Sequence, residues 1–319
     1  MLRSFFIYLS KAAWARKIVT GWSFAWKMAS RFVAGDKLED GIKAAQALNS
    51  KGINVSLDHL GEQTDSPEQA RQAAQDIVTA LDAIQQTGVR ANVSIKLTQI
   101  GLAIDPELCA ENLTTIVDHA HENHNFVRVD MEDSNVTQLT LDLLYRVRAK
   151  GYDNVGIVIQ SYLYRSEEDI RKLADDCIAV RLCKGAYKEP ASVAFPRKKD
   201  VDKSYDRLAE LLIDGTFKHS CPMGSPDGRF PALVGLATHD PLRIEAAKAC
   251  AAQKGVPKGA IEFQMLYGIR RELQDQLVAE GYPMRVYVPY GTEWYPYYMR
   301  RLAERPANIW FFVSNFFRR

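Results

Sequence analysis

The sequence lacks the marks of several common protein classes. No apolar run approaches the roughly 18 residues that would span a bilayer, and there is no GxGxxG, P-loop, GxSxG or HExxH motif. The five cysteines include no CxxC pair, and their odd number argues against a full disulfide framework. No apolar stretch followed by a small-residue cleavage site begins the chain, which argues against a secretory signal. A reducing compartment is therefore the simplest expectation.

The composition is that of an ordinary globular protein. The 319 residues are 47% hydrophobic and 25% charged, enough for one large core or two modest ones. A net charge of +2 gives no general reason to expect a nucleic-acid partner. His119, His121 and His124 lie close together and are interpreted as a solvated helix surface, with no metal site expected.

The first 34 residues differ from the rest of the chain. They carry six Lys or Arg residues and many aromatic residues, with no acidic residue before Asp36. Three interpretations fit: a helical arm packed on its own domain, a segment that lies on an anionic membrane surface, or a mitochondrial presequence. We expect an arm at 1–48, a barrel at 49–307 and an apolar C-terminal tail at 308–319.

From residue 50 onward, short apolar runs alternate with longer amphipathic stretches. Near-continuous apolar runs are typical of parallel strands that are buried on both faces. Eight strand–helix units in about 250 residues predict an α/β fold of the (β/α)8 TIM barrel type. A doubly wound open sheet is the alternative, and the missing GxGxxG makes it the weaker one. The eight runs are Ile53–Leu57, Ala91–Leu97, Phe126–Met131, Val155–Ile159, Ala179–Leu182, Ala232–Ala237, Ile261–Phe263 and Met284–Val288.

The intervening stretches have recognisable helix starts. Ser66-Pro67, Asp105-Pro106 and Asp240-Pro241 each combine a capping side chain with a proline in the first turn. The acidic residues after Ser166 and the Thr292-Glu293 pair are two further starts. The segment 219–231 is rich in Gly, Pro and Ser and predicts a loop before the sixth strand.

Polar side chains end or follow most of the strand runs, where a TIM barrel has its active site. Any one of them is explained by a helix cap or a solvated loop, but their coincidence indicates a polar site. The cations Lys96, Arg181, Lys184, Arg300 and Arg301 would suit a carboxylate, a phosphate or a reduced flavin. Arg300 and Arg301 could equally form a solvated face paired with Glu304.

Two other kinds of function remain open from the residues alone. Lys96 could form a Schiff base in a barrel lyase, if its amine were held neutral. The basic N-terminal segment could instead belong to a membrane-binding scaffold without catalytic activity.

The strand-end motifs resemble a known family. In order, they are "VSLDHLGE", "VSIKLTQIGL", "VRVDMEDS", "GIVIQSYLYRSEEDI", "VRLCKGAYKEP", "LATHD", "EFQMLYGIR" and "VRVYVPYGTEWYPYYMRRLAERPAN". The chain from Ile53 to Asn308 resembles bacterial monofunctional proline dehydrogenases and the equivalent domain of bifunctional proline-catabolising enzymes. Cys183 departs from the family pattern, where valine is usual.

The resemblance implies a distorted (β/α)8 barrel that binds FAD and oxidises L-proline to 1-pyrroline-5-carboxylate, the first step of proline catabolism. It also implies that electrons pass to a membrane quinone, which places the protein in the cytoplasm, peripherally on the inner face of the cell membrane. The residues alone do not distinguish FAD from FMN.

The resemblance also implies roles for individual residues. Arg181 would lie near the reactive flavin nitrogen, and Asp130 at the centre of the site would orient a cationic neighbour. Arg300 and Arg301 would bind the substrate carboxylate together with Lys96. Tyr287 and Leu266 would form the wall around the ring, and Glu62 would pair with Arg300 to gate the pocket. The remaining cofactor-binding residues would be Gln160, Lys184, Gly185, Ala186, Tyr187, Thr238, His239 and Gln264.

Overall fold

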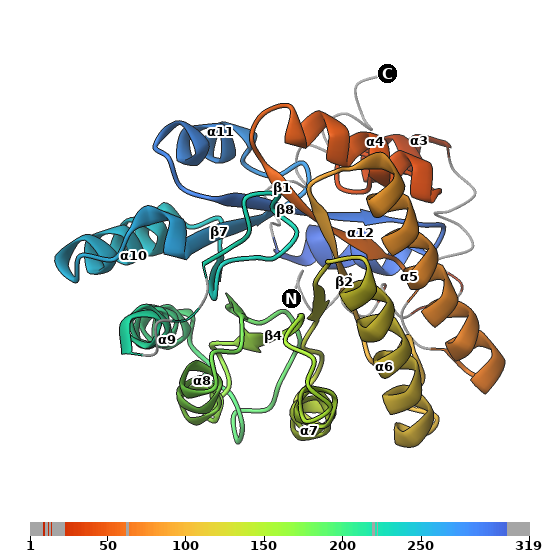
Figure 1. Cartoon of the computed structure of the whole chain (residues 1–319), viewed down its shortest axis with the longest axis horizontal. Helices are drawn as coiled ribbons and strands as arrows, with labels where there is room; N and C mark the ends of the chain where they lie inside the picture. The colour runs from red at the N-terminus through yellow and green to blue at the C-terminus, as the bar shows by residue number, and fades with distance from the viewer. Residues whose placement is uncertain are drawn as a thin grey trace.

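In the computed structural model, a closed parallel barrel forms the centre of the molecule (Figure 1). The structure describes residues 23–61, 64–218 and 223–304, together with Leu9, Ala12, Trp14 and Cys221. Each strand pairs with its neighbours in the chain, and β1 closes the barrel against β8. The strands are β1 (Asn54–His59), β2 (Ala91–Ile95), β3 (Val127–Val129), β4 (Val155–Gln160), β5 (Val180–Cys183), β6 (Val234–Ala237), β7 (Ile261–Leu266) and β8 (Met284–Tyr290).

One α-helix follows each strand, so the (β/α)8 prediction is confirmed. These helices are α5 (Pro67–Thr87), α6 (Pro106–Glu122), α7 (Thr137–Arg148), α8 (Ser166–Asp175), α9 (Lys198–Lys218), α10 (Pro241–Gln253), α11 (Arg271–Ala279) and α12 (Trp294–Glu304). Within the described residues, α3 (Ser23–Ala29) and α4 (Leu38–Asn49) precede β1, and a short 3-10 helix, η1 (Lys258–Ala260), precedes β7.

The predicted helix starts are present with their caps. The Ser66 side chain accepts a hydrogen bond from the backbone N–H of Gln69. Asp105 and Asp240 cap α6 and α10 in the same way, and each of the three helices has proline in its first turn. Each cap satisfies a backbone N–H that has no partner within its helix.

The main hydrophobic core lies between the barrel and the surrounding helices. Because side chains alternate along a strand, every second strand residue points outward into this layer. Val55 and Leu57 of β1 are such residues, and they are almost completely buried together with Leu81 and Ile84 of α5. The apolar half of each strand therefore holds the helices in place.

The other half of each strand points into the barrel, and at many positions it is polar. At the N-terminal end of the strands, Arg285 and Glu262 form an ion pair at 2.8 Å, and both are about 1% exposed. Arg285 also donates to the carbonyls of Val55 and Gly228. TIM barrel interiors are more often filled by branched apolar side chains. Here the pairing of Arg285 with Glu262 offsets the loss of hydration of both charges.

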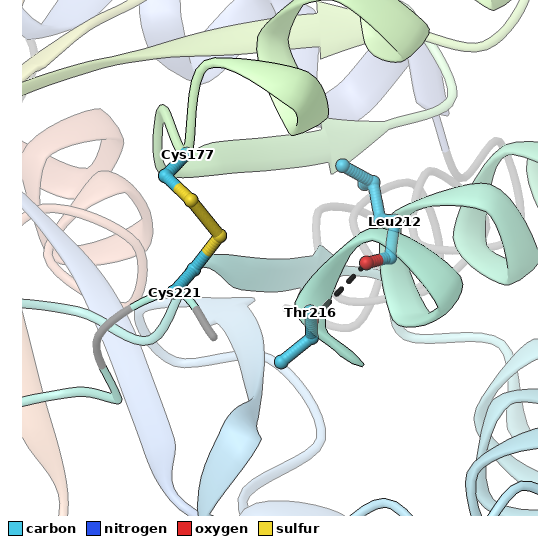
Figure 2. The surroundings of a disulfide bond; sticks show 4 residues. All are labelled: Cys177, Leu212, Thr216 and Cys221. Atoms are coloured by element: carbon cyan, nitrogen blue, oxygen red, sulfur yellow. Dashed lines mark hydrogen bonds between the residues drawn. A yellow bond between two sulfur atoms is a disulfide. The ribbon is translucent and has the colours of Figure 1, made fainter. Parts of the chain in front are cut away.

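The cysteines correct one sequence expectation. Cys177 and Cys221 are joined by a disulfide, whereas the odd cysteine count and missing CxxC had indicated reduced thiols (Figure 2). The two residues are 44 apart in sequence. They precede β5 and β6, and the pairing of these two strands brings them together. Cys109, Cys183 and Cys250 remain thiols.

Part of the N-terminal segment packs on the barrel domain. Ala29, Phe32 and Val33 are buried in one cluster with Trp294 and Tyr298 of α12. Packing of the arm therefore holds for residues 23–34. Most of residues 1–22 and the tail after Glu304 lie outside the described residues, so the membrane interpretation of those segments is not addressed. No helix in the described part of the chain is long and apolar enough to span a membrane.

We predict that Arg285→Met lowers the free energy of unfolding by about 3–5 kcal/mol, because it leaves the Glu262 carboxylate buried without its counterion. Urea denaturation measures this. Arg171→Met is the control, since its pair with Glu167 is half exposed and should contribute less than about 1 kcal/mol. Similar losses in the two variants would contradict the interpretation.

Candidate active site

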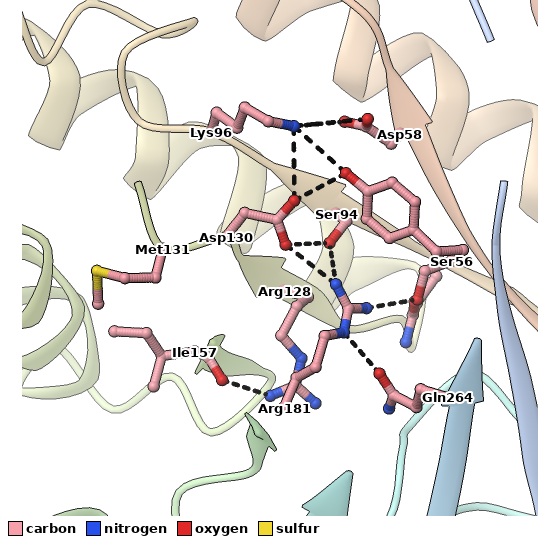
Figure 3. A network of polar contacts seen from close by, with 12 residues as sticks. Ser56, Asp58, Ser94, Lys96, Arg128, Asp130, Met131, Ile157, Arg181 and Gln264 are labelled. Carbon is pink, nitrogen blue, oxygen red and sulfur yellow. Dashed lines mark hydrogen bonds and ion pairs between the residues drawn. The ribbon is translucent and has the colours of Figure 1, made fainter. Parts of the chain in front are cut away.

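Asp130 connects most of the polar groups at the C-terminal end of the barrel (Figure 3). Its Oδ1 accepts from Arg181 Nη1 at 3.0 Å and from the Ser94 hydroxyl at 2.8 Å. Its Oδ2 accepts from the Tyr287 hydroxyl at 2.8 Å and lies 3.6 Å from Lys96 Nζ. One carboxylate thus fixes side chains from β2, β5 and β8 relative to one another.

Arg181 is held by four side chains of the barrel interior. Besides Asp130, its Nε donates to Gln264 Oε1 at 2.6 Å, Nη1 to the Ser94 hydroxyl at 2.8 Å and Nη2 to the Ser56 hydroxyl at 3.1 Å. Gly235 makes this possible, because a Cβ there would lie 2.7 Å from the Gln264 amide nitrogen. The guanidinium is 6% exposed and has a single orientation fixed by these bonds.

Lys96 is surrounded by oxygen atoms. Its Nζ lies 3.3 Å from Asp58 Oδ1 and donates to the Tyr287 hydroxyl at 3.3 Å, with Asp130 on another side. Asp58 is completely buried, so its negative charge is poorly screened. Two carboxylates stabilise the ammonium form of Lys96. This arrangement disfavours the neutral amine that a Schiff-base lyase requires.

Tyr287 contributes both a ring and a hydroxyl to this group. Its hydroxyl accepts from Lys96 and donates to Asp130. Burial, reinforced by Asp130, raises the pKa of the Tyr287 hydroxyl well above its usual value. The hydroxyl therefore stays protonated and neutral, and its ring lies 5.3 Å from the Arg181 guanidinium carbon.

Leu266, His239 and Thr238 lie together where β6 and β7 end. His239 Nε2 accepts from the backbone N–H of Leu266 at 3.0 Å, which assigns the proton of the neutral ring to Nδ1. The Thr238 hydroxyl accepts from the N–H of Asp240. Leu266 is paired in register with Tyr287, so these two side chains are neighbours across β7 and β8.

The loop after β5 approaches the end of β4 closely. Gly185 has φ of +111°, and a Cβ at this position would lie 2.5 Å from the Tyr162 ring, so only glycine fits. Lys184 forms ion pairs with Asp202 of α9 and with Asp240 at 3.0 Å. Glu189 accepts from both the N–H and the hydroxyl of Ser134, which ties this loop to the loop after β3.

Two buried polar atoms beside this loop have no hydrogen-bond partner in the described structure: Gln160 Oε1 and the Tyr162 hydroxyl. Gln160 Nε2 donates to the Met131 carbonyl at 3.3 Å, which leaves the amide oxygen as an acceptor. Burial raises the pKa of Tyr162, so its hydroxyl remains a donor. A buried acceptor, a buried donor and a glycine that permits close approach fit a bound planar group with its own donors and acceptors, such as a flavin.

Arg300 and Arg301 lie on α12, which packs against the same end of the barrel. Leu60, just after β1, and Tyr287 of β8 both contact the α12 cluster. The Arg301 guanidinium lies 5.0 Å from the Tyr297 ring centre. Glu62 lies outside the described residues, so its expected pairing with Arg300 is not addressed.

The sequence analysis overlooked several residues of the network. Asp58, Ser56, Ser94 and Glu189 were not assigned individual roles from the sequence. A signal for the two serines exists, because each lies two residues before a polar strand-end residue and so shares its inward face. Glu189 carries no comparable signal, since its partner Ser134 is 55 residues away.

Comparison with known proteins decides the family. A family model described as "Proline dehydrogenase" matches residues 41–313. The chain belongs to the proline dehydrogenase family. Members of this family oxidise proline as the first step of its catabolism.

Individual relatives match over nearly the whole chain. The chain is 40% identical to "Proline dehydrogenase 2" of Bacillus subtilis (strain 168), covering 97% of this chain and 96% of that protein. It is 42% identical to "Proline dehydrogenase" of Deinococcus radiodurans, covering 91% of this chain and 90% of the relative. A crystal structure of proline utilization A (PutA) from Bdellovibrio bacteriovorus inactivated by N-propargylglycine superposes with a TM-score of 0.78 at 25% identity. The match covers 88% of this chain and 33% of that one, so this chain spans about a third of that protein.

Proposed function

We propose that the protein oxidises L-proline to 1-pyrroline-5-carboxylate by hydride transfer to bound FAD, and that a membrane quinone then accepts the electrons. The observation that carries the proposal is the group formed by Asp130, Arg181, Lys96 and Tyr287 at the C-terminal end of a proline dehydrogenase barrel. FAD, when bound, supplies the hydride acceptor.

The substrate carboxylate is assigned to Arg300, Arg301 and Lys96. A guanidinium matches a carboxylate with two parallel hydrogen bonds, which fixes the ring as well as the charge. Leu266 and Tyr287 form the wall around the ring, an assignment supported by their pairing in register. Glu62 is assigned the role of gating the pocket through a pair with Arg300.

Arg181 is assigned to the reacting end of the flavin. The negative charge that develops as hydride arrives is stabilised by a fixed cation, and Arg181 is already fixed by four side chains. Arg181 and Lys96 also disfavour protonation of the substrate amine, which must be neutral as the hydride leaves. Asp130 holds these cations in place.

The rest of the cofactor is assigned to residues at the ends of β4 to β7. Gln160 offers its buried amide oxygen to a ring N–H, and Gly185 permits the close approach. On binding, Lys184 exchanges part of its pairing with Asp202 and Asp240 for the cofactor. The other residues assigned to the cofactor are Ala186, Tyr187, Thr238, His239 and Gln264.

Delivery of electrons to a quinone requires contact with a membrane, and we assign it to the chain ends on the inner face of the cell membrane. Six cations lie before residue 35 and no acidic residue lies before Asp36, while the last ten residues include five aromatic side chains. Each cation near an anionic surface contributes about 1 kcal/mol, screened by salt. Residues 23–34 pack on α12, and Leu9 and Ala12 also contact that cluster. The membrane contact is therefore assigned to the cationic side chains among the first 22 residues, which are four of the six, and to the aromatic tail.

The purified protein is expected to be yellow, with a flavin absorbance band that bleaches when L-proline is added without oxygen. The extracted cofactor should have the mass of FAD rather than FMN. D-Proline is the control and should leave the band unchanged over the same time. A colourless protein, or a band that proline does not bleach, would refute the proposed function.

Tyr287→Ser is expected to lower turnover of proline and to narrow the difference in kcat/KM between proline and 4-hydroxyproline, because the ring that excludes the added hydroxyl is gone. Tyr287→Phe is the matched control: it keeps the ring but removes the hydrogen bond to Asp130, so turnover should fall while selectivity is retained. If the selectivity of Tyr287→Ser is unchanged, Tyr287 is not the residue that excludes 4-hydroxyproline, and Leu266 becomes the candidate.

Replacing Lys11, Arg16 and Lys17 by glutamine should weaken binding to anionic liposomes, and raising the salt concentration should release the unaltered protein. Reduction of a soluble dye by proline should change little, since the proposal gives these residues no part in binding proline or the flavin. Cosedimentation measures the binding. If the triple variant binds anionic liposomes as well as the unaltered protein does, Lys11, Arg16 and Lys17 do not form the membrane contact.

A further inference from the structure

Arg128 is a second guanidinium inside the barrel, one level below Arg181. It lies on β3 and is 1% exposed. Its Nη1 donates to the carbonyls of Ile157 and Ala179, and its guanidinium carbon lies 5.0 Å from the Phe126 ring centre. Gly156 provides the space, because a Cβ there would lie 2.9 Å from Arg128 Nη1. The backbone therefore accommodates this side chain specifically.

The charge of Arg128 has no close counterion. Lys96, Arg181 and Arg285 each have a carboxylate within 4.0 Å. Among the buried cations of the described residues, only Arg128 has none at that distance. Its Nη2 is buried without a hydrogen-bond partner. Two carbonyls and an aromatic ring face the group, but none of them carries a negative charge.

The arrangement is unfavourable for the protein taken alone. Burial, and then the neighbouring charge of Arg181, lower the pKa of Arg128 well below its usual value, and the more distant carboxylates of Glu262 and Asp130 offset this only in part. A guanidinium nevertheless keeps its proton in proteins. A buried charge without a close counterion destabilises the fold, and an apolar side chain of similar volume would avoid that penalty. The positive field of Arg128 therefore remains poorly screened inside the barrel.

We propose that Arg128 acts at a distance on the oxidation of proline: its unpaired charge, behind Arg181, stabilises the reduced form of the bound flavin and so raises the midpoint potential. This rests on the proposed function. Arg128 does not contact the substrate and is not a catalytic residue. A purely structural alternative is that Arg128 only ties the start of β5 to β4 through the two carbonyls.

The experiment measures the midpoint potential of the flavin in the full-length protein by dye-linked equilibrium titration. Arg128→Met removes the charge and should weaken the preference for the reduced flavin about tenfold, which is about 30 mV more negative for a two-electron couple. Arg128→Gln should give the same shift. Arg128→Lys keeps the charge but not both carbonyl bonds, so its potential should stay near that of the unaltered protein.

Phe126→Leu is the matched packing control. It removes the ring beneath Arg128 and should lower stability without moving the potential, because the charge is retained. An unchanged potential in Arg128→Met or Arg128→Gln, with the unaltered protein active, overturns the inference and leaves the proposed function intact. If both neutral variants lose the flavin, an Arg128→Lys variant that keeps it at the original potential supports the inference. Loss of the flavin in Arg128→Lys as well overturns it.

Discussion

The contact between the Asp130 carboxylate and the Arg181 guanidinium is the interaction on which the rest of the site depends. It joins the third and fifth strands across the barrel interior, and Lys96 and Tyr287 take their positions from the same carboxylate. A charge pair this deeply buried is favourable only when its remaining donors are satisfied. The serines of β1 and β2 and Gln264 of β7 satisfy those of Arg181. The site is thus fixed by the barrel itself.

A polar barrel interior changes what stabilises the fold. The outward half of each strand makes the apolar core with the helices, so the inward half is available for charge. At the N-terminal end of the strands, Arg285 and Glu262 neutralise each other. At the C-terminal end, the Asp130 network lies where a TIM barrel has its active site. Arg128 lies between the two without a carboxylate partner. The apolar core thus lies outside the barrel, and the buried charges lie inside it.

Much of the candidate site could be predicted from the sequence, because the functional residues of a TIM barrel lie at the C-terminal ends of its strands. Lys96, Asp130, Arg181 and Tyr287 were selected on that basis or by family motif, and the structure brings the four together. The supporting residues were harder to find. Ser56 and Ser94 look like ordinary strand residues, and Glu189 acts through Ser134, which belongs to another loop.

The sequence by itself determined the order of strands and helices, because apolar runs, capping residues and first-turn prolines are local signals that act within a few residues. It also determined which residues lie at strand ends. Only the tertiary structure decided which of them meet. The arrangement of the strands in the barrel joined Cys177 to Cys221, gave Asp130 two cations and a phenol, and left Arg128 with carbonyls alone. Those outcomes depend on distances between strands far apart in the chain, and no local pattern encodes them.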